Sequence, residues 1–434
     1  MPPASLEDDE GHAGFLNSYP AMPYDFFPYG GIERSILLYK VPSTRITDIT
    51  IKTKIDGTIS YKISLSDNFT GTIKTNIDEY NKTITVDNCC SIEGKIKINN
   101  PQLWCCENPF LYEFNARLEF KNELIDEYSE TFGIREIRIE GEKLLLNGKE
   151  IYLRGFGKHE DFYVSGKGHN RAVNVKDFGL LKWIGANSFR TSHYPYDEEI
   201  LDMADRQGFL IIDETPFVSL DNRMYKDDIL IKAKRVISEL IARDKNHPSV
   251  IMWSLANEPY VDTDIGVHFF KEMADHTRFL DNTRPITYVS YLEPSENKAI
   301  PYFDVMCLNK YYGWYTGCGQ IEEMLPEFEV CLDNFYDTFQ KPLIVTEFGA
   351  DAIQGMHSLP AQMFTEDYQT DLLKRHIELI ESKPYCIGYH IWAFADFKTA
   401  QTVTRVLVNH KGVFTREREP KASAYMLKHM LQKK

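Results

Sequence analysis

Two glutamates stand directly after strongly apolar segments of the chain. Glu258 follows Asn257 and the run at 250–256, and Glu347 follows the run at 343–346. Such runs predict buried strands, and in a (β/α)₈ barrel the residues at the carboxyl ends of the strands line one pocket. Two carboxylates beside one glycosidic bond suffice to hydrolyse it, because one protonates the leaving oxygen while the other attacks the sugar or activates water. The pair therefore predicts hydrolysis of a glycosidic bond.

A structural interpretation of each glutamate has to be weighed against this chemistry. A single Glu at a strand end could cap the following helix or pair with a basic neighbour. Capping does not explain why Asn257 precedes one glutamate or why Gly349 follows close behind the other. Taken together, the two sites favour catalysis.

The elements that position these residues follow from the periodicity after about residue 134. Short apolar runs alternate there with longer segments of helical period, such as 227–243 and 364–381. This alternation predicts a (β/α)₈ TIM barrel over residues 134–434, with a doubly wound sheet as the alternative. The eight expected strands are 151–157, 187–190, 209–213, 250–257, 285–290, 305–308, 343–346 and 387–394.

A different pattern fills residues 37–133. About seven short runs alternate polar and apolar residues and are separated by turn residues, as in Ile49–Ile55. Period two predicts strands with one buried face, and their number and spacing predict an immunoglobulin-like β-sandwich, although the Cys-Trp-Cys pattern is absent. The expected fold is thus multidomain, with a β-sandwich followed by an α/β barrel.

Four segments of the chain resemble glycoside hydrolase family 2, and specifically its β-glucuronidases. The resemblance runs from about Pro20 to the C-terminus and is carried by the motifs RTSHYP at 190–195, NEP at 257–259, LNKYYGWY at 308–315 and TEFGAD at 346–351. It implies that Glu258 is the general acid/base and Glu347 the nucleophile of a retaining exo-acting enzyme that works by double displacement.

The segment from Arg405 to Gly412 resembles the Asn-x-Lys element with which β-glucuronidases hold the sugar carboxylate. The resemblance implies that Arg405, Asn409 and Lys411 bind this group, and a charge-assisted hydrogen bond to it is worth roughly 1.5–3 kcal/mol. Asn409 and Lys411 could instead be ordinary turn residues. The implied substrates are terminal β-D-glucuronides, either small molecules or glucuronate-capped oligosaccharides.

The resemblance implies further substrate contacts from other segments. Asp25 matches an aspartate that reaches a sugar hydroxyl, and the other matching positions are His193, Asn257, Tyr311, Tyr315 and Trp392. An aromatic residue after a barrel strand is also a common core residue. For His159-Glu160-Asp161 we expect a pairing network that supports the barrel mouth.

Residues 1–36 are expected to be the remnant of an N-terminal sugar-binding jelly-roll domain, because family members begin with a longer domain of this kind. We expect Asp25 to lie on a segment with few anchoring contacts, and the full-length form to be a homo-oligomer. Three alternatives remain. The chain could be another family 2 enzyme acting on galacturonides, galactosides or mannosides, a natural carbohydrate-binding protein without turnover, or a chain inactivated by loss of this domain.

Composition excludes several other classes of protein. The net charge of −15 disfavours a nucleic-acid partner, and no apolar stretch is long enough to span a membrane. Eight cysteines show neither a disulfide pattern nor metal-ligand spacing, so we expect a cytoplasmic protein. No motif indicates a cofactor or a metal ion.

Overall fold

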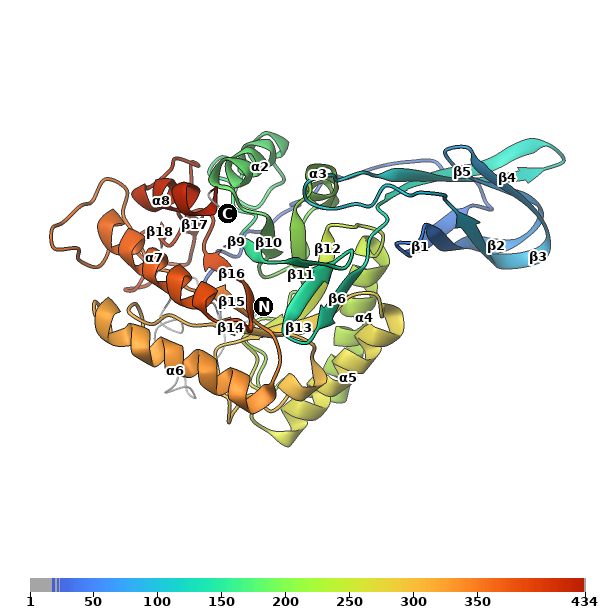
Figure 1. The fold of residues 1–434 in the computed structure, drawn as a ribbon. Helices are drawn as coiled ribbons and strands as arrows, with labels where there is room; N and C mark the ends of the chain where they lie inside the picture. Colours follow the sequence, from blue (N-terminus) through green and yellow to red (C-terminus); the bar gives the residue numbers. More distant parts are fainter. Residues whose placement is uncertain (1–17, 20–21, 23, 433–434) are drawn as a thin grey trace.

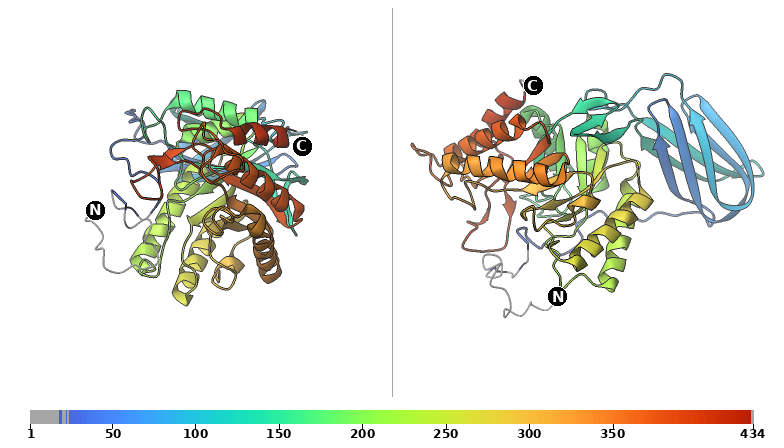
Figure 2. Two further views of the ribbon diagram at one scale, coloured as in Figure 1. Left: turned by 90° about the vertical axis from the view of Figure 1, so that its left-hand side faces the viewer. Right: turned by 60° about the horizontal axis from the view of Figure 1, so that its bottom comes forward.

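The structure is a computed structural model that describes residues 18–19, 22 and 24–432. A β-sandwich lies on one side of the molecule and a larger barrel forms the rest (Figure 1). In the right-hand view of Figure 2 the sandwich projects from one side of the barrel. No helix in the described ranges has the length and apolarity needed to cross a membrane.

The sandwich has five strands among the described residues rather than the seven that the sequence pattern predicted. The long strands β2 and β3 explain the difference, because the register of their pairing shifts between Ser64 and Gly71. Strand β1 pairs with the first half of β2 and β4 pairs with the second half, so one strand serves both layers. The strands are β1 (Ile46–Thr53), β2 (Thr58–Ile77), β3 (Tyr80–Lys97), β4 (Tyr112–Phe120) and β5 (Glu123–Phe132).

The second domain is a closed barrel of eight parallel strands within residues 153–392, which confirms the predicted TIM barrel over the doubly wound alternative. The barrel closes where β16 pairs with β9. Each predicted run overlaps one observed strand. These strands are β9 (Leu153–Lys158), β10 (Ser188–Thr191), β11 (Leu210–Glu214), β12 (Val250–Asn257), β13 (Ile286–Ser290), β14 (Met306–Asn309), β15 (Leu343–Glu347) and β16 (Cys386–Trp392).

Helices surround the barrel strands and mostly begin at a side-chain cap. Asn170, Thr263 and Thr365 each accept a hydrogen bond from the first turn of a helix. Between β13 and β14 the described chain forms only the short 3₁₀ helix η1 (Ile300–Tyr302). The helices are α2 (Arg171–Ile184), α3 (Glu198–Gln207), α4 (Asp227–Asp244), α5 (Asp264–Leu280), α6 (Ile321–Phe339), α7 (Glu366–Ser382) and α8 (Ala422–Leu431).

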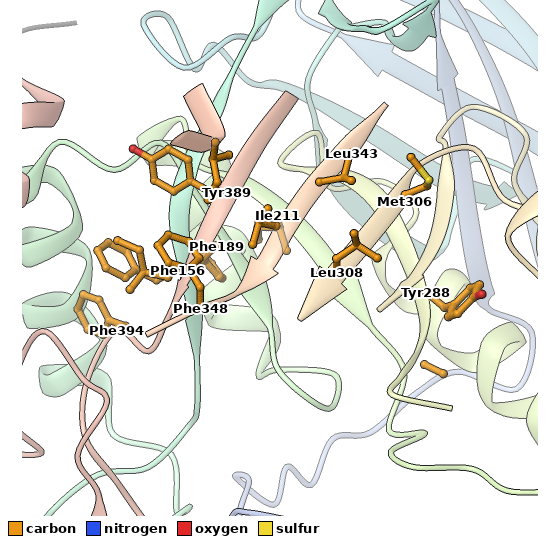
Figure 3. Close-up of a cluster of buried hydrophobic side chains, with 14 of the residues drawn as sticks. Phe156, Phe189, Ile211, Tyr288, Met306, Leu308, Leu343, Phe348, Tyr389 and Phe394 are labelled. Atoms are coloured by element: carbon orange, nitrogen blue, oxygen red, sulfur yellow. The ribbon is translucent and has the colours of Figure 1, made fainter. Parts of the chain in front are cut away.

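Two apolar clusters hold the barrel together. The larger one packs outward-facing strand residues such as Phe189 and Leu308 against the helices (Figure 3). The second packs strand residues such as Ile212 and Ile344 against a small sheet at the base. That sheet consists of β6 (Ile137–Glu140), β7 (Lys143–Leu146) and β8 (Lys149–Ile151). Apolar side chains fill the base of the barrel. The polar residues of the strands are therefore concentrated at the opposite end, where the strands have their carboxyl ends.

The described part of the N-terminal segment is anchored at the barrel mouth, so the expectation of few anchoring contacts was wrong. The backbone N–H of Phe27 donates to the carbonyl of Lys398 at 2.9 Å. Arg34 pairs with Glu160 at 2.6 Å, and the Tyr29 hydroxyl donates to Asp161 at 3.1 Å. Sequence reasoning assigned the 159–161 cluster to pairing but could not identify these partners.

Candidate active site

Charged and amide side chains occur together at the ends of five barrel strands, which lie on both sides of β13. Arg190 stands near the end of β10, Glu214 ends β11, Asn257 ends β12, Asn309 ends β14 and Glu347 ends β15. All five are at least nine-tenths buried. Burial of so many polar groups is favourable only if they satisfy one another, and all five form hydrogen bonds within the site, although Nε of Arg190 has no partner among the described residues.

Glu347 is held by a cation and a hydroxyl. The Arg190 guanidinium donates through Nη2 to Oε1 of Glu347, and the Tyr311 hydroxyl donates to Oε2 at 2.7 Å. Through Nη1 the same arginine also pairs with Glu214 at 2.8 Å. His193 lies 2.8 Å from Glu214 through Nδ1 and 3.8 Å from Glu347 through Nε2. The carboxylate of Glu347 is therefore fixed in position and partly neutralised.

Glu258 is the partly exposed member of the pair. It follows β12 with φ of 53°, in the left-handed region that non-glycine residues rarely adopt. The Asn309 amide donates to Oε1 of Glu258 at 2.8 Å and to Oδ1 of Asn257 at 3.2 Å. Glu258 thus contacts the neutral amide of Asn309, whereas Glu347 contacts the charged guanidinium of Arg190.

The environment raises the pKa of both glutamates. Burial is the main cause for Glu258, and the charges of Glu214 and Asp25 add to it, while the Asn309 hydrogen bond and Arg190 act in the opposite direction. Burial also raises the pKa of Glu347, against the lowering effects of Arg190, His193 and Tyr311. Only Glu347 touches the guanidinium, and this contact favours the ionised form of its carboxyl group.

A second cluster holds the predicted carboxylate-binding residues. Lys411 and Arg405 are buried, and they pair respectively with Asp351 at 2.5 Å and with Asp25 at 2.5 Å. Asn409 lies in the short hairpin of β17 (Phe397–Lys398) and β18 (Val408–Asn409) and donates to Asp25 at 2.8 Å. The alternative of a simple turn for Asn409 and Lys411 does not describe these contacts.

Two tyrosines connect the clusters. The Tyr315 hydroxyl accepts hydrogen bonds from Arg405 at 2.7 Å and from Lys411 at 2.9 Å. Its ring lies 5.0 Å from that of Tyr311, which donates to Glu347. On another side of the site Trp392 stacks on His193 at 5.1 Å. The structure thus brings together all eleven residues that the sequence proposed for the site.

Two glycines allow backbone segments to meet beside these side chains. A Cβ atom at Gly349 would lie 2.2 Å from the carbonyl oxygen of Trp392, and one at Gly412 would lie 2.1 Å from the backbone N of Asp396. Neither contact is possible for a residue with a side chain. This close approach explains why each glycine closely follows a site residue, Glu347 or Lys411.

Sequence reasoning gave no role to several residues that complete the site. Arg190, Glu214, Asn309 and Asp351 all hold a predicted residue in place. A signal was present, since each is a polar residue at or just after an apolar strand run. Strand ends also carry structural ion pairs, so position alone does not select these four.

Two family models match the chain. One, described as the glycosyl hydrolases family 2 TIM barrel domain, covers residues 137–434, and one described as glycosyl hydrolases family 2 covers residues 43–135. The chain belongs to glycoside hydrolase family 2. This membership confirms the expectation of a glycoside hydrolase and the predicted order of sandwich and barrel.

Relatives of this family 2 chain include named β-glucuronidases. The chain is 44% identical to a β-glucuronidase of Paenibacillus borealis, with 99% of this chain and 74% of the relative covered. Identity to the human β-glucuronidase is 41%, with 93% of this chain and 64% of the relative covered. The family 2 chain therefore spans about two thirds to three quarters of the length of these relatives.

Solved structures are similar over nearly the whole family 2 chain. The β-D-glucuronidase of Dictyoglomus thermophilum superposes with a TM-score of 0.89 at 42% identity, covering 98% of this chain and 75% of that structure. A Bifidobacterium dentium β-glucuronidase complexed with coumarin-3-O-glucuronide has a TM-score of 0.89 at 34% identity, covering 95% of this chain and 70% of that structure.

Proposed function

We propose that the chain hydrolyses terminal β-D-glucuronides with retention of configuration, as an exo-acting enzyme. The observation that carries the proposal is the direct connection between the glutamate pair and the buried cation cluster through Tyr311 and Tyr315. The names of the relatives and the glucuronide in one similar structure support the same substrate class.

In the first step Glu258 acts as the acid. Burial raises its pKa and so favours the protonated form, and it donates that proton to the glycosidic oxygen as the bond from this oxygen to C1 breaks. Glu347 attacks C1 with its carboxylate and forms a glycosyl ester, and the aglycone leaves as an alcohol. Arg190 and Tyr311 orient Glu347 and hold it ionised for this attack.

In the second step Glu258 acts as the base. It removes a proton from a water molecule, which attacks C1 and releases Glu347 as a carboxylate and the sugar with its original configuration. This mechanism requires the two carboxyl groups to lie about 5–5.5 Å apart when the sugar is bound.

Recognition of the substrate carboxylate rests on Lys411, Arg405 and Asn409. Lys411 is buried, and its Nζ atom donates hydrogen bonds to Asp351 and Tyr315. These contacts hold the ammonium group in one position inside the protein. Asp25 already bonds Arg405 and Asn409, and the sugar must share or replace those bonds. A buried cation with fixed neighbours discriminates strongly against a neutral CH₂OH group, because the unsolvated charge would be left with one partner fewer.

The test compares chromogenic glycosides that differ only at C4 and C6. We expect the β-glucuronide to have the highest kcat/KM and the β-glucoside and β-galactoside to be poor. If a β-galacturonide is cleaved faster than the glucuronide, the chain is a β-galacturonidase instead. The cation cluster recognises the carboxylate at C6 and does not distinguish the configuration at C4. No turnover of any of them would contradict the proposed function and favour a binding protein.

Stereochemistry and acid catalysis need separate measurements. NMR of the first-formed sugar should show the β-anomer of glucuronic acid, and the α-anomer would contradict retention. Glu258→Gln should retain more activity on a glucuronide with a good leaving group than on one with a poor leaving group, because only the poor one needs a proton. Equal losses on both would contradict the role of Glu258 as the acid.

We also propose that the protein works in a reducing compartment such as the cytoplasm and that its full-length form assembles as a homo-oligomer. The free state of all eight cysteines is compatible with such a compartment. Cell fractionation and light scattering of the full-length protein test the two proposals.

A further inference from the structure

A cavity of about 270 Å³ lies between the sandwich and the base of the barrel. Its walls are β1, the linker at 132–138 and the loops that precede β12 and β13. These loops lie at the amino ends of the barrel strands, whereas Glu258 and Glu347 stand at the carboxyl ends. The cavity is therefore separate from the candidate active site.

Most of the charged residues that line the cavity are basic. Five of the lining side chains are cationic and one, Glu136, is acidic. In a chain with a net charge of −15, such a concentration of positive charge is not a consequence of overall composition. The five cations are Lys52, Arg135, Arg138, Lys245 and Arg284.

Three of these cations already have carboxylate partners. Lys245 pairs with Asp48 at 2.6 Å, Arg284 with Asp281 at 2.7 Å, and Arg138 with Glu140 at 2.9 Å. Their charges are balanced within the protein. The two remaining cations of the lining, Lys52 and Arg135, therefore contribute most to the positive electrostatic potential in the cavity.

Arg135 is different because it is buried and forms no ion pair with a carboxylate of residues 24–432. Its side chain donates only to backbone carbonyls, to Pro248 at 3.0 Å and to Val250 at 2.6 Å. Only 7% of the residue is exposed. Burial, together with the nearby charge of Arg284, lowers its pKa to about 9. Asp281 and Asp205 act on this charge only from a distance. A buried guanidinium that contacts no carboxylate is unfavourable, and an anion in the cavity would relieve it.

We propose that this cavity is a binding site for a small oxyanion, with inorganic phosphate as its simplest occupant. A planar guanidinium presents donors in a geometry that suits tetrahedral oxyanions, and the exposed Lys52 adds a second cation to the lining. The volume is several times the roughly 30 Å³ share of one water molecule, so an anion and bridging waters can fit. Bound there, the anion would tie β1 of the sandwich to the strands of the barrel base.

The experiment measures phosphate binding by calorimetry and by thermal unfolding, against chloride at equal ionic strength. We expect saturable binding of one phosphate and a rise in Tm with its concentration, because a ligand that binds only the folded state stabilises it. Lys411→Ala should bind phosphate equally well, since that variant removes a cation of the active site and leaves the cavity intact.

A cavity variant should weaken the binding without removing Arg135, whose hydrogen bonds support the fold. Lys52→Glu combined with Asn282→Asp replaces one cation of the lining with an anion and adds a second anion, and we expect at least a tenfold higher Kd. Lys62→Gln, an exposed lysine on β2 outside the cavity, is the matched control and should leave Kd unchanged. Circular dichroism checks that each variant is folded.

Two results would overturn the proposal. One is the absence of saturable phosphate binding to the unmodified chain. The other is binding that Lys411→Ala abolishes while the double variant retains it, which would place the anion in the active site. In a crystal soaked with tungstate, anomalous density beside Arg135 would support the site and density only beside Lys411 would refute it.

Discussion

The two halves of the candidate active site are built in different ways. Glu258 and Glu347 belong to the ends of strands, and their partners Asn309 and Arg190 also come from barrel strands. The carboxylate-binding residues come from a hairpin and loops after β16, and one partner, Asp25, lies on the N-terminal segment. Under the proposed function, the residues on the barrel strands perform the chemistry, and the residues on the peripheral segments select the sugar.

The largest effect on activity should come from substitution of a glutamate at the end of a barrel strand. Glu347→Gln removes the nucleophile and the charge that Arg190 and Tyr311 hold, so kcat for a β-glucuronide should fall at least about ten-thousand-fold. Steady-state assays measure this fall in kcat, and the control is Glu322→Gln, a substitution of an exposed glutamate on α6. Residual activity within a hundredfold of the unmodified chain would contradict the assignment of Glu347.

Substitution in the cluster of Arg405, Asn409 and Lys411 should lower activity on the glucuronide selectively. Lys411→Ala should lower kcat/KM for the glucuronide about tenfold or more, corresponding to a loss of at least roughly 1.4 kcal/mol, and barely change that for the glucoside. Lys428→Ala on α8 is the control, because this lysine packs over Trp183 outside the site. Equal losses on both substrates would show that Lys411 supports structure and does not select the sugar.

The pH profile should respond to Asn309. Its amide stabilises the charged form of Glu258, so Asn309→Ala removes a lowering effect and the pKa of Glu258 rises. Glu258 must be protonated to donate, and the basic limb of kcat/KM should therefore move to higher pH, by roughly 0.5–1 unit for a hydrogen bond worth about 1 kcal/mol. A limb that stays in place or moves to lower pH would mean that another group controls it.

The smallest effect should come from the anchor of the N-terminal segment. The Arg34–Glu160 pair is one-third exposed at Arg34, so it is worth less than about 1 kcal/mol. Arg34→Ala should raise KM up to about fivefold through looser placement of Asp25 and leave kcat nearly unchanged, more visibly at low salt. Arg223→Ala, at an arginine paired with Asp221 on the surface, is the control. A large fall in kcat with unchanged KM would show that the segment supports the barrel strands.

The sequence alone determined the barrel and the positions of the two glutamates at its strand ends. Apolar runs and helical periods are local properties, so all eight strands could be located and Glu258 and Glu347 placed at the carboxyl ends of two of them. The sandwich was recognised from its alternation. Its strand count was wrong because a bend inside a long strand looks like two strands in the sequence.

Only the tertiary structure decided which partner each site residue contacts. Arg190 reaches Glu347 across 157 positions of sequence, and Arg405 reaches Asp25 across 380. No local pattern encodes such pairs, because they exist only once the barrel closes and the hairpin folds over its mouth. The same holds for the cavity at the base, where Arg135 and Arg284 meet through the packing of two domains. Periodicity specifies which residues are buried, and the closed fold specifies which buried charges balance one another.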